Sequence, residues 1–175
     1  PAGFYPFSLQ GAFRCAGRGR GLLGRAGWDG EPPVLALCPL NPFWWPVKPD
    51  LLKTATHRLF GSNAEEHYTS IYFHAYGPER QAQQQAYLQA IADGVNAFCA
   101  ETEAFVVLVG MEAVDRRAAE ALQPLLHRPA PAFVSDEHDM YALASLLRRC
   151  HWLVSSRYHA IVCSMPGQVA SGGIT

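Results

Sequence analysis

The sequence lacks an excess of charge of either sign. Fourteen Lys and Arg residues stand against fifteen Asp and Glu, which gives a formal net charge of -1, and only 17% of the residues are charged. A surface that attracts nucleic acid or anionic membrane as a whole needs a basic excess, so neither partner is predicted. A hydrophobic fraction of 49% is far above that of disordered chains. The 175 residues therefore suffice for one globular domain, or one with a short extension.

Long apolar runs and paired cysteines are missing too. No stretch approaches the roughly 20 apolar residues of a membrane-spanning helix, and no signal-peptide pattern is present. The five cysteines form no C-x-x-C pair, which argues against a zinc knuckle or a dithiol redox motif. Most of them lie in apolar runs, as free cysteines do in a reducing compartment, so we predict a cytoplasmic location. Because the chain begins at Pro1 and stops at Thr175, we interpret it as part of a longer protein that lacks its N-terminal domain here.

Residues 1–33 are rich in glycine and arginine and show no sustained helical or strand period. Within them, Gly19 to Gly24 formally matches the pattern G-x-G-x-x-G. A dinucleotide-binding fingerprint requires a strand before this pattern and a helix after it, and neither flank has that character. We therefore reject the motif and interpret residues 1–33 as a linker or the remnant of a preceding domain.

From Val34 onward, short apolar runs alternate with amphipathic segments. The runs predict buried strands at residues 34–38, 104–109, 132–135 and 152–155, and the intervening patterns predict helices at 81–101, 114–127, 139–149 and 158–165. Residues 43–80, dense in aromatics, proline and glycine, are expected to form an inserted loop with a short helix or two. Strands that alternate with helices predict an α/β fold over residues 34–175: a Rossmann-like parallel sheet flanked by helices.

Ligands of such sheets bind outside the carboxyl ends of the strands, and the turn after the fourth predicted strand carries the most chemistry. Ser155 and Ser156 are expected at the helix-cap position, where free N–H groups bind anions. Arg157 adds a planar charged fork, and His159 can transfer a proton near neutral pH. A second interpretation stays open: Arg157 pairs with an acid on a neighbouring loop, and His159 only makes helix contacts.

The segment Leu153–Val162, with its Arg157-Tyr158-His159, resembles the R-x-H segment of the polysaccharide pyruvyl transferase family. The helix expected at Asp139 to Leu147 resembles the one that leads into this segment, and the likeness covers Val34 to Thr175. It implies two Rossmann-like halves, as in glycosyltransferase-B folds, with the active site between them. The implied activity is transfer of a pyruvyl group from phosphoenolpyruvate to a sugar of a cell-surface polysaccharide or its precursor, which forms a pyruvate ketal without a cofactor.

The resemblance also implies that Arg157 and His159 contact phosphoenolpyruvate. The donor is an anion with a carboxylate and a phosphate, which suits Arg157 and the N–H groups after Ser156. We assign His159 to proton transfer, because ketal formation protonates the donor's methylene carbon and removes a proton from a sugar hydroxyl. Tyr158 and the absence of a proline after Gly167 depart from the expected pattern without removing a charge.

Asn41, Glu112 and Trp44 follow predicted strands and are candidate acceptor contacts. Each has a structural alternative: Asn41 in an ordinary turn, Glu112 beside a helix dipole, and Trp44 anchoring the insertion. No metal site is predicted, because Asp136 or Asp139 is explained more simply as the cap of the following helix.

Two other functions remain open, namely a sugar-nucleotide glycosyltransferase or epimerase of the same architecture, and a binding fragment without activity. If Arg157 or His159 were buried beside a neutralising partner, the resemblance to the transferase family would concern the fold alone and would no longer support the activity.

Overall fold

A computed structural model describes residues 9–40, 47–49, 72–74 and 78–174. The chain divides into two compact units, residues 1–40 with 88–175 and residues 41–87. In its described part, the first unit holds a five-stranded parallel sheet with the spatial order β5-β4-β1-β6-β7. The strands are β1 (Val34–Cys38), β4 (Phe105–Gly110), β5 (Ala132–Val134), β6 (Trp152–Ser155) and β7 (Ala170–Gly173). The predicted α/β fold with a parallel sheet flanked by helices is therefore confirmed.

The central strands form where the sequence has continuous apolar runs. Every residue of β1 is buried, as expected for a strand covered on both faces. In contrast, β7 consists of Ala, Ser and two Gly residues, and all four are exposed. It pairs with β6 in the register Trp152↔Ala170 to Ser155↔Gly173. This fifth strand was not predicted, because its residues carry neither an apolar run nor an alternating pattern.

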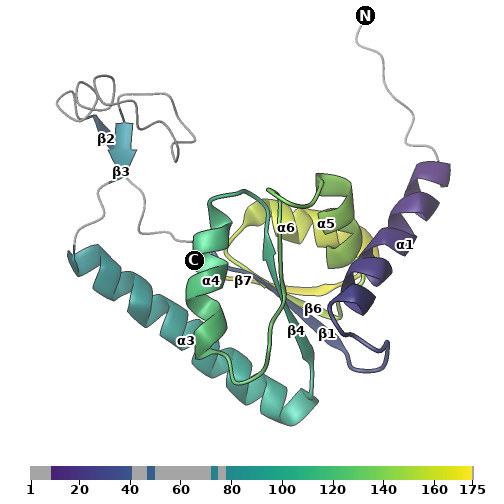
Figure 1. Cartoon of the computed structure of the whole chain (residues 1–175), viewed down its shortest axis with the longest axis horizontal. Coiled ribbons are helices and arrows are strands. Elements are labelled where there is room, and N and C mark those ends of the chain that lie inside the picture. The colour runs from purple at the N-terminus through teal and green to yellow at the C-terminus, as the bar shows by residue number, and fades with distance from the viewer. Residues whose placement is uncertain (1–8, 41–46, 50–71, 75–77, 175) are drawn as a thin grey trace, which may run out of the picture. The chain divides into compact units, whose positions relative to one another are not determined.

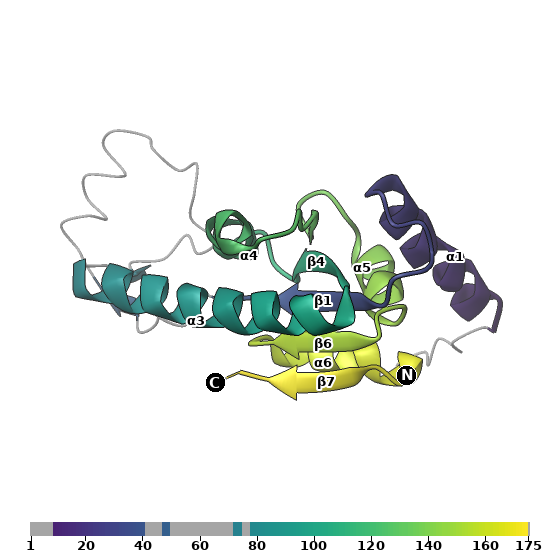
Figure 2. The same cartoon turned by 90° about the horizontal axis from the view of Figure 1, so that it is seen from below.

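Helices cover both faces of the sheet (Figures 1 and 2). They are α3 (Pro78–Thr102), α4 (Asp115–Leu122) with the 3-10 turn η2 (Gln123–Leu125), α5 (Met140–Leu147), and α6 (Tyr158–Ser164) with η3 (Met165–Gly167). From Leu88 onward, α3 lies with α4 on one face, whereas α5 and α6 lie on the opposite face. The sequence predicts an apolar stripe of Tyr87, Leu88, Ile91, Val95 and Phe98 on this helix; Leu88, Ile91 and Val95 are buried, and Tyr87 and Phe98 are partly buried.

The sequence suggested a linker or the remnant of a preceding domain over residues 1–33, and the described residues from Leu9 onward hold a packed helix in place of an extended linker. They form helix α1 (Leu9–Arg25), which packs against α5 and contributes the buried Leu22 and Leu23 to the core. The close approach explains a glycine: a Cβ on Gly19 would lie 2.4 Å from the carbonyl oxygen of Ser145. The Gly19 N–H also donates to the Ser145 hydroxyl at 2.9 Å. The glycine-rich pattern therefore permits helix packing, and its rejection as a fingerprint agrees with its place inside a helix.

The second unit contains β2 (Val47–Pro49) and β3 (Tyr72–His74), which pair antiparallel. The short helices expected within residues 43–80 fall largely outside the described residues. Helix α3 begins at Pro78, slightly before its predicted start. Among the described residues, no helix combines the length and apolar character needed to cross a membrane.

Candidate functional site

The ends of three strands lie side by side at the carboxyl edge of the sheet. Strand β1 lies between β4 and β6, and all three run parallel, so their carboxyl ends are neighbours. From β1 the chain adds β4 and then β5 on one side, and afterwards β6 and then β7 on the other side. The direction of strand addition therefore reverses between β1 and β6. Open α/β sheets bind ligands at such a reversal. The turns after β4 and β6 therefore flank the position where a ligand is expected.

The β6–α6 turn is built by the Ser155 hydroxyl. Ser155 is buried, and its Oγ accepts the Arg157 N–H at 2.9 Å while donating to the Arg157 carbonyl oxygen at 2.9 Å. The Ser156 N–H donates to the carbonyl oxygen of Cys38 at 3.1 Å, which joins the turn to the end of β1. The residue at the N-cap of α6 is Arg157, with no side-chain cap. The expectation that the two serines occupy the cap position is therefore wrong; Ser155 shapes the turn instead.

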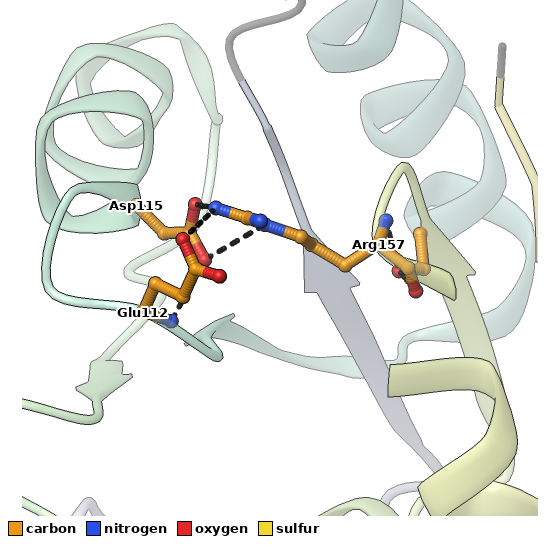
Figure 3. A network of polar contacts seen from close by, with 4 residues as sticks. Glu112, Asp115 and Arg157 are labelled. Carbon is orange, nitrogen blue, oxygen red and sulfur yellow. Dashed lines mark hydrogen bonds and ion pairs between the residues drawn. The ribbon is translucent and has the colours of Figure 1, made fainter. Parts of the chain in front are cut away.

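The Arg157 side chain reaches across the end of β1 to the β4–α4 turn (Figure 3). Its Nε lies 3.1 and 3.2 Å from the two carboxylate oxygens of Asp115, and its Nη2 lies 2.5 Å from Oδ1. Nη2 also donates to Oε2 of Glu112 at 3.0 Å. The side chain of Arg157 is 16% exposed, that of Asp115 1% and that of Glu112 48%. One guanidinium thus connects two turns through a buried pair and an exposed pair.

The second interpretation of Arg157 is the one that the structure shows. The arginine is mostly buried and pairs with acids on a neighbouring loop. Arg157 pairs with both Asp115 and Glu112, so one cation meets two carboxylates and its charge is already neutralised within the protein. Arg157 is therefore buried beside neutralising partners, the case in which the likeness to the transferase family extends to the position of the arginine but not to an unpaired charge. His159 differs, because it is exposed.

Asp115 is the residue that the sequence analysis missed. It is the first residue of α4, and its Oδ2 accepts the Glu112 N–H at 3.0 Å, while its own N–H donates to the Glu112 carbonyl oxygen. The carboxylate thus orders the turn and faces Arg157 from within the protein. The available signal was topological: β4 and β6 flank β1, so acids in the turn after β4 lie within reach of an arginine in the turn after β6.

Burial and ion pairing act in opposite directions on this pair. Burial raises the pKa of Asp115 above its ordinary value, more than the contacts with Arg157 lower it. For Arg157, burial is the largest single effect and lowers the pKa, yet the contacts with Asp115 and Glu112 together raise it. The guanidinium therefore stays charged, and the buried carboxylate depends on it as counter-ion.

Cys38, at the end of β1, contributes no nucleophile. Its thiol is buried, and burial raises its pKa far above the ordinary value, so that it remains protonated near neutral pH. Its role is packing in the core on the side of α1, α5 and α6.

His159 lies two residues after Arg157, within the first turn of α6. It is exposed, and its ring lies 5.9 Å from that of Tyr158, which is 74% exposed. The turn thus brings Arg157 and His159 to the same edge of the sheet, with the arginine directed to Asp115 and the histidine accessible. Of the acceptor candidates, Glu112 lies in this cluster, whereas Asn41 and Trp44 lie outside the described residues.

The acids after β5 have structural partners. Asp139 caps α5, since its Oδ1 accepts the Ala142 N–H at 2.8 Å, as predicted. Asp136 does not cap a helix; it accepts from Nε and Nη2 of Arg116 at 2.6 and 2.7 Å. Within the described part of the chain, no group of three His, Cys, Asp or Glu residues has the arrangement of a metal site.

Comparison with protein-family models, with curated proteins and with solved structures returned no match.

Proposed function

We propose that this chain contributes the donor-binding half of a pyruvyl transferase, which moves the pyruvyl group of phosphoenolpyruvate onto a sugar of a cell-surface polysaccharide or its precursor. The observation that carries the proposal is the position of Arg157 and His159 in the turn after β6, beside the reversal of strand order. The likeness of the R-x-H segment to that transferase family supports the same assignment. A second Rossmann-like half, as in glycosyltransferase-B folds, would complete the cleft above this edge.

The chemistry assigns a step to each of the two residues. A proton from His159 adds to the methylene carbon of phosphoenolpyruvate, which becomes the methyl group of the ketal. A sugar hydroxyl attacks the central carbon and a second hydroxyl closes the ring, while the bond from that carbon to the phosphate oxygen breaks. Of the two hydroxyl protons, one restores the imidazole proton and the other leaves with inorganic phosphate. Arg157 would stabilise the charge on the departing phosphate.

The ion pairs of Arg157 set a condition on this proposal. A donor with a carboxylate and a phosphate meets a cluster in which two acids already neutralise the cation. Donor binding therefore requires the exposed Glu112 to give up its contact, while the buried Asp115 keeps the guanidinium in place. An Arg157 that serves only as a tether between turns would bind no donor, and the chain would then be a binding fragment without this activity.

A second candidate function is a sugar-nucleotide glycosyltransferase or epimerase. Glu112 favours it, because it follows β4, the second strand in chain order within the sheet, where acids of dinucleotide-binding folds contact a ribose hydroxyl. The Glu112 carboxylate faces Arg157, which makes it less available to a ribose.

Thermal shift measurements on the full-length protein separate the two candidates. The transferase predicts that phosphoenolpyruvate raises the melting temperature and that uridine diphosphate does not. The reverse result would establish the sugar-nucleotide alternative. No shift with either ligand would support the binding fragment.

The His159→Asn variant tests the assigned proton transfer. We expect a loss of roughly 100-fold or more in kcat, the scale of general acid–base catalysis, with a much smaller change in donor affinity. Equal losses in kcat and donor affinity would show a histidine that only binds the donor.

The Arg157→Lys variant tests the role of Arg157 in donor binding. It keeps the charge but loses the planar fork of the guanidinium, so the donor KM should rise. An unchanged donor KM would refute this role.

A further inference from the structure

The guanidinium of Arg157 has two edges, and the protein uses them differently. The edge formed by Nε and Nη2 faces Asp115, with N–O distances of 3.1, 3.2 and 2.5 Å. The end-on edge, formed by Nη1 and Nη2, has a single contact, from Nη2 to Glu112 at 3.0 Å. Nη1 donates no hydrogen bond to any described residue. Both nitrogens of the Nε–Nη2 edge thus donate to Asp115, whereas only one nitrogen of the Nη1–Nη2 edge donates to Glu112.

The two carboxylates also differ in how readily they can leave. Asp115 is 1% exposed, and it holds the Glu112 N–H as well as Arg157, so its removal from the guanidinium would leave a buried charge without a partner. The Glu112 side chain is 48% exposed and makes one hydrogen bond to Arg157. Exposed ion pairs contribute little to stability, so an incoming anion can displace Glu112 at small cost.

We infer that Glu112 is an internal competitor for Arg157, which occupies part of the end-on edge until a carboxylate or phosphate replaces it, while Asp115 positions the guanidinium. A guanidinium edge with two parallel N–H groups matches the paired oxygens of a carboxylate or phosphate. Glu112 takes only one of these donors, so an oxyanion that takes both gains a contact that the protein itself does not supply. Figure 3 shows the two acids converging on one end of the Arg157 side chain. The identity of the anion as phosphoenolpyruvate rests on the proposed function; the competition does not.

The neighbouring turns supply a matched control. Arg116 donates to Asp136 through Nε and Nη2, and its Nη2 also contacts Oε1 of Glu137 at 2.9 Å. This arrangement repeats that of Arg157, Asp115 and Glu112, and the Glu137 side chain is also exposed, at 61%. Glu137→Gln thus removes an equal charge from an equivalent contact. This contact lies near the ends of β4 and β5, away from the point between β1 and β6 where the strand order reverses.

The experiment measures binding of inorganic phosphate and of phosphoenolpyruvate to the full-length protein by calorimetry, at constant ionic strength in a phosphate-free buffer. Glu112→Gln should tighten binding of both anions by roughly two- to fivefold, the factor that corresponds to an exposed ion pair. Glu137→Gln should leave both dissociation constants unchanged, because Asp136 is 33% exposed and does not fix the Arg116 guanidinium as the buried Asp115 fixes that of Arg157. Without added anion, both variants should melt within about 2 °C of the wild type, since surface substitutions change stability little.

The outcomes separate this inference from the proposed function. Tighter phosphate binding by Glu112→Gln, with no turnover of phosphoenolpyruvate, would retain the competition and reject the transferase. Unchanged or weaker binding in Glu112→Gln, or an equal gain in Glu137→Gln, would overturn the competition even if the transferase activity were found. Absence of binding of either anion to both the wild type and Glu112→Gln would overturn it as well.

Discussion

Two arginine–aspartate pairs link neighbouring elements at the carboxyl edge of the sheet, and they differ in burial. Arg157 and Asp115 join the turns after β6 and β4, with side chains 16% and 1% exposed. Arg116 and Asp136 join α4 to the turn after β5, with side chains 28% and 33% exposed. Both arginines use Nε and Nη2 toward the aspartate and place Nη2 beside a glutamate. The contact geometry is thus nearly the same.

The pKa values of the two aspartates nevertheless shift in opposite directions. Burial raises the pKa of Asp115 despite its contacts with Arg157. The hydrogen bonds from Arg116 lower the pKa of the exposed Asp136, because little desolvation opposes them. The exposed ion pair therefore adds little to the free energy of folding. In the buried pair, loss of either partner would leave the other charge buried without a counter-ion.

The largest expected effect is the loss of stability in Arg157→Met. The substitution leaves Asp115 buried without its counter-ion, which should lower the free energy of unfolding by about 3–5 kcal/mol near neutral pH. Arg116→Met, the matched control, should cost no more than about 1 kcal/mol. Urea denaturation of both variants beside the wild type measures the difference. Equal losses in the two variants would contradict the contrast between the buried and the exposed pair.

The loss in Arg157→Met should also depend on pH. Without Arg157, the already raised pKa of Asp115 rises further. A carboxyl group with a raised pKa in the folded state binds its proton more tightly there than in the unfolded chain, so its contribution to stability falls as pH rises through the folded pKa. The deficit relative to the wild type should therefore be smaller at about pH 4.5 than at about pH 7. A deficit that is independent of pH would assign the loss to packing.

The double variant Arg157→Met with Asp115→Asn separates stability from binding. The asparagine retains an oxygen for the Glu112 N–H and removes the buried charge, so roughly 2 kcal/mol of the loss should return. Phosphoenolpyruvate binding should stay absent, because the guanidinium is gone. Denaturation and calorimetry on the same samples measure both. Recovery of donor binding in the double variant would exclude Arg157 from the donor site.

The smallest expected effect concerns the exposed pair in acid. The lowered pKa of Asp136 contributes stability that is fully present above the pKa of the unfolded aspartate and is lost as pH falls through the folded value. Asp136→Asn should therefore flatten the decline of stability below about pH 4 by a few tenths of a kcal/mol. Urea midpoints from about pH 2.5 to 5 measure this slope. A steeper decline in Asp136→Asn than in the wild type would contradict the assignment.

Sequence patterns predicted the four apolar strands and the helices between them, because a buried strand or an amphipathic helix depends on its own residues. They missed β7, whose Ala, Ser and Gly residues form a strand only because the edge of β6 offers hydrogen-bond partners. They also missed α1, in a segment interpreted as a linker or the remnant of a preceding domain, where Gly19 lets the helix approach α5 closely. Both errors concern segments that are stabilised by distant parts of the chain.

The candidate site divides in the same way. The motif identified Arg157 and His159, since their spacing after an apolar run is a local property. The sequence alone left open whether Arg157 would face an anion or an acid. That choice depended on the strand order, which brings the turn with Asp115, 42 residues away along the chain, across β1 to the guanidinium. Local sequence determined the strands, the helices and the chemical groups at the edge of the sheet, but only the tertiary structure decided which charges meet there, because Coulomb interactions depend on distance in space and on burial.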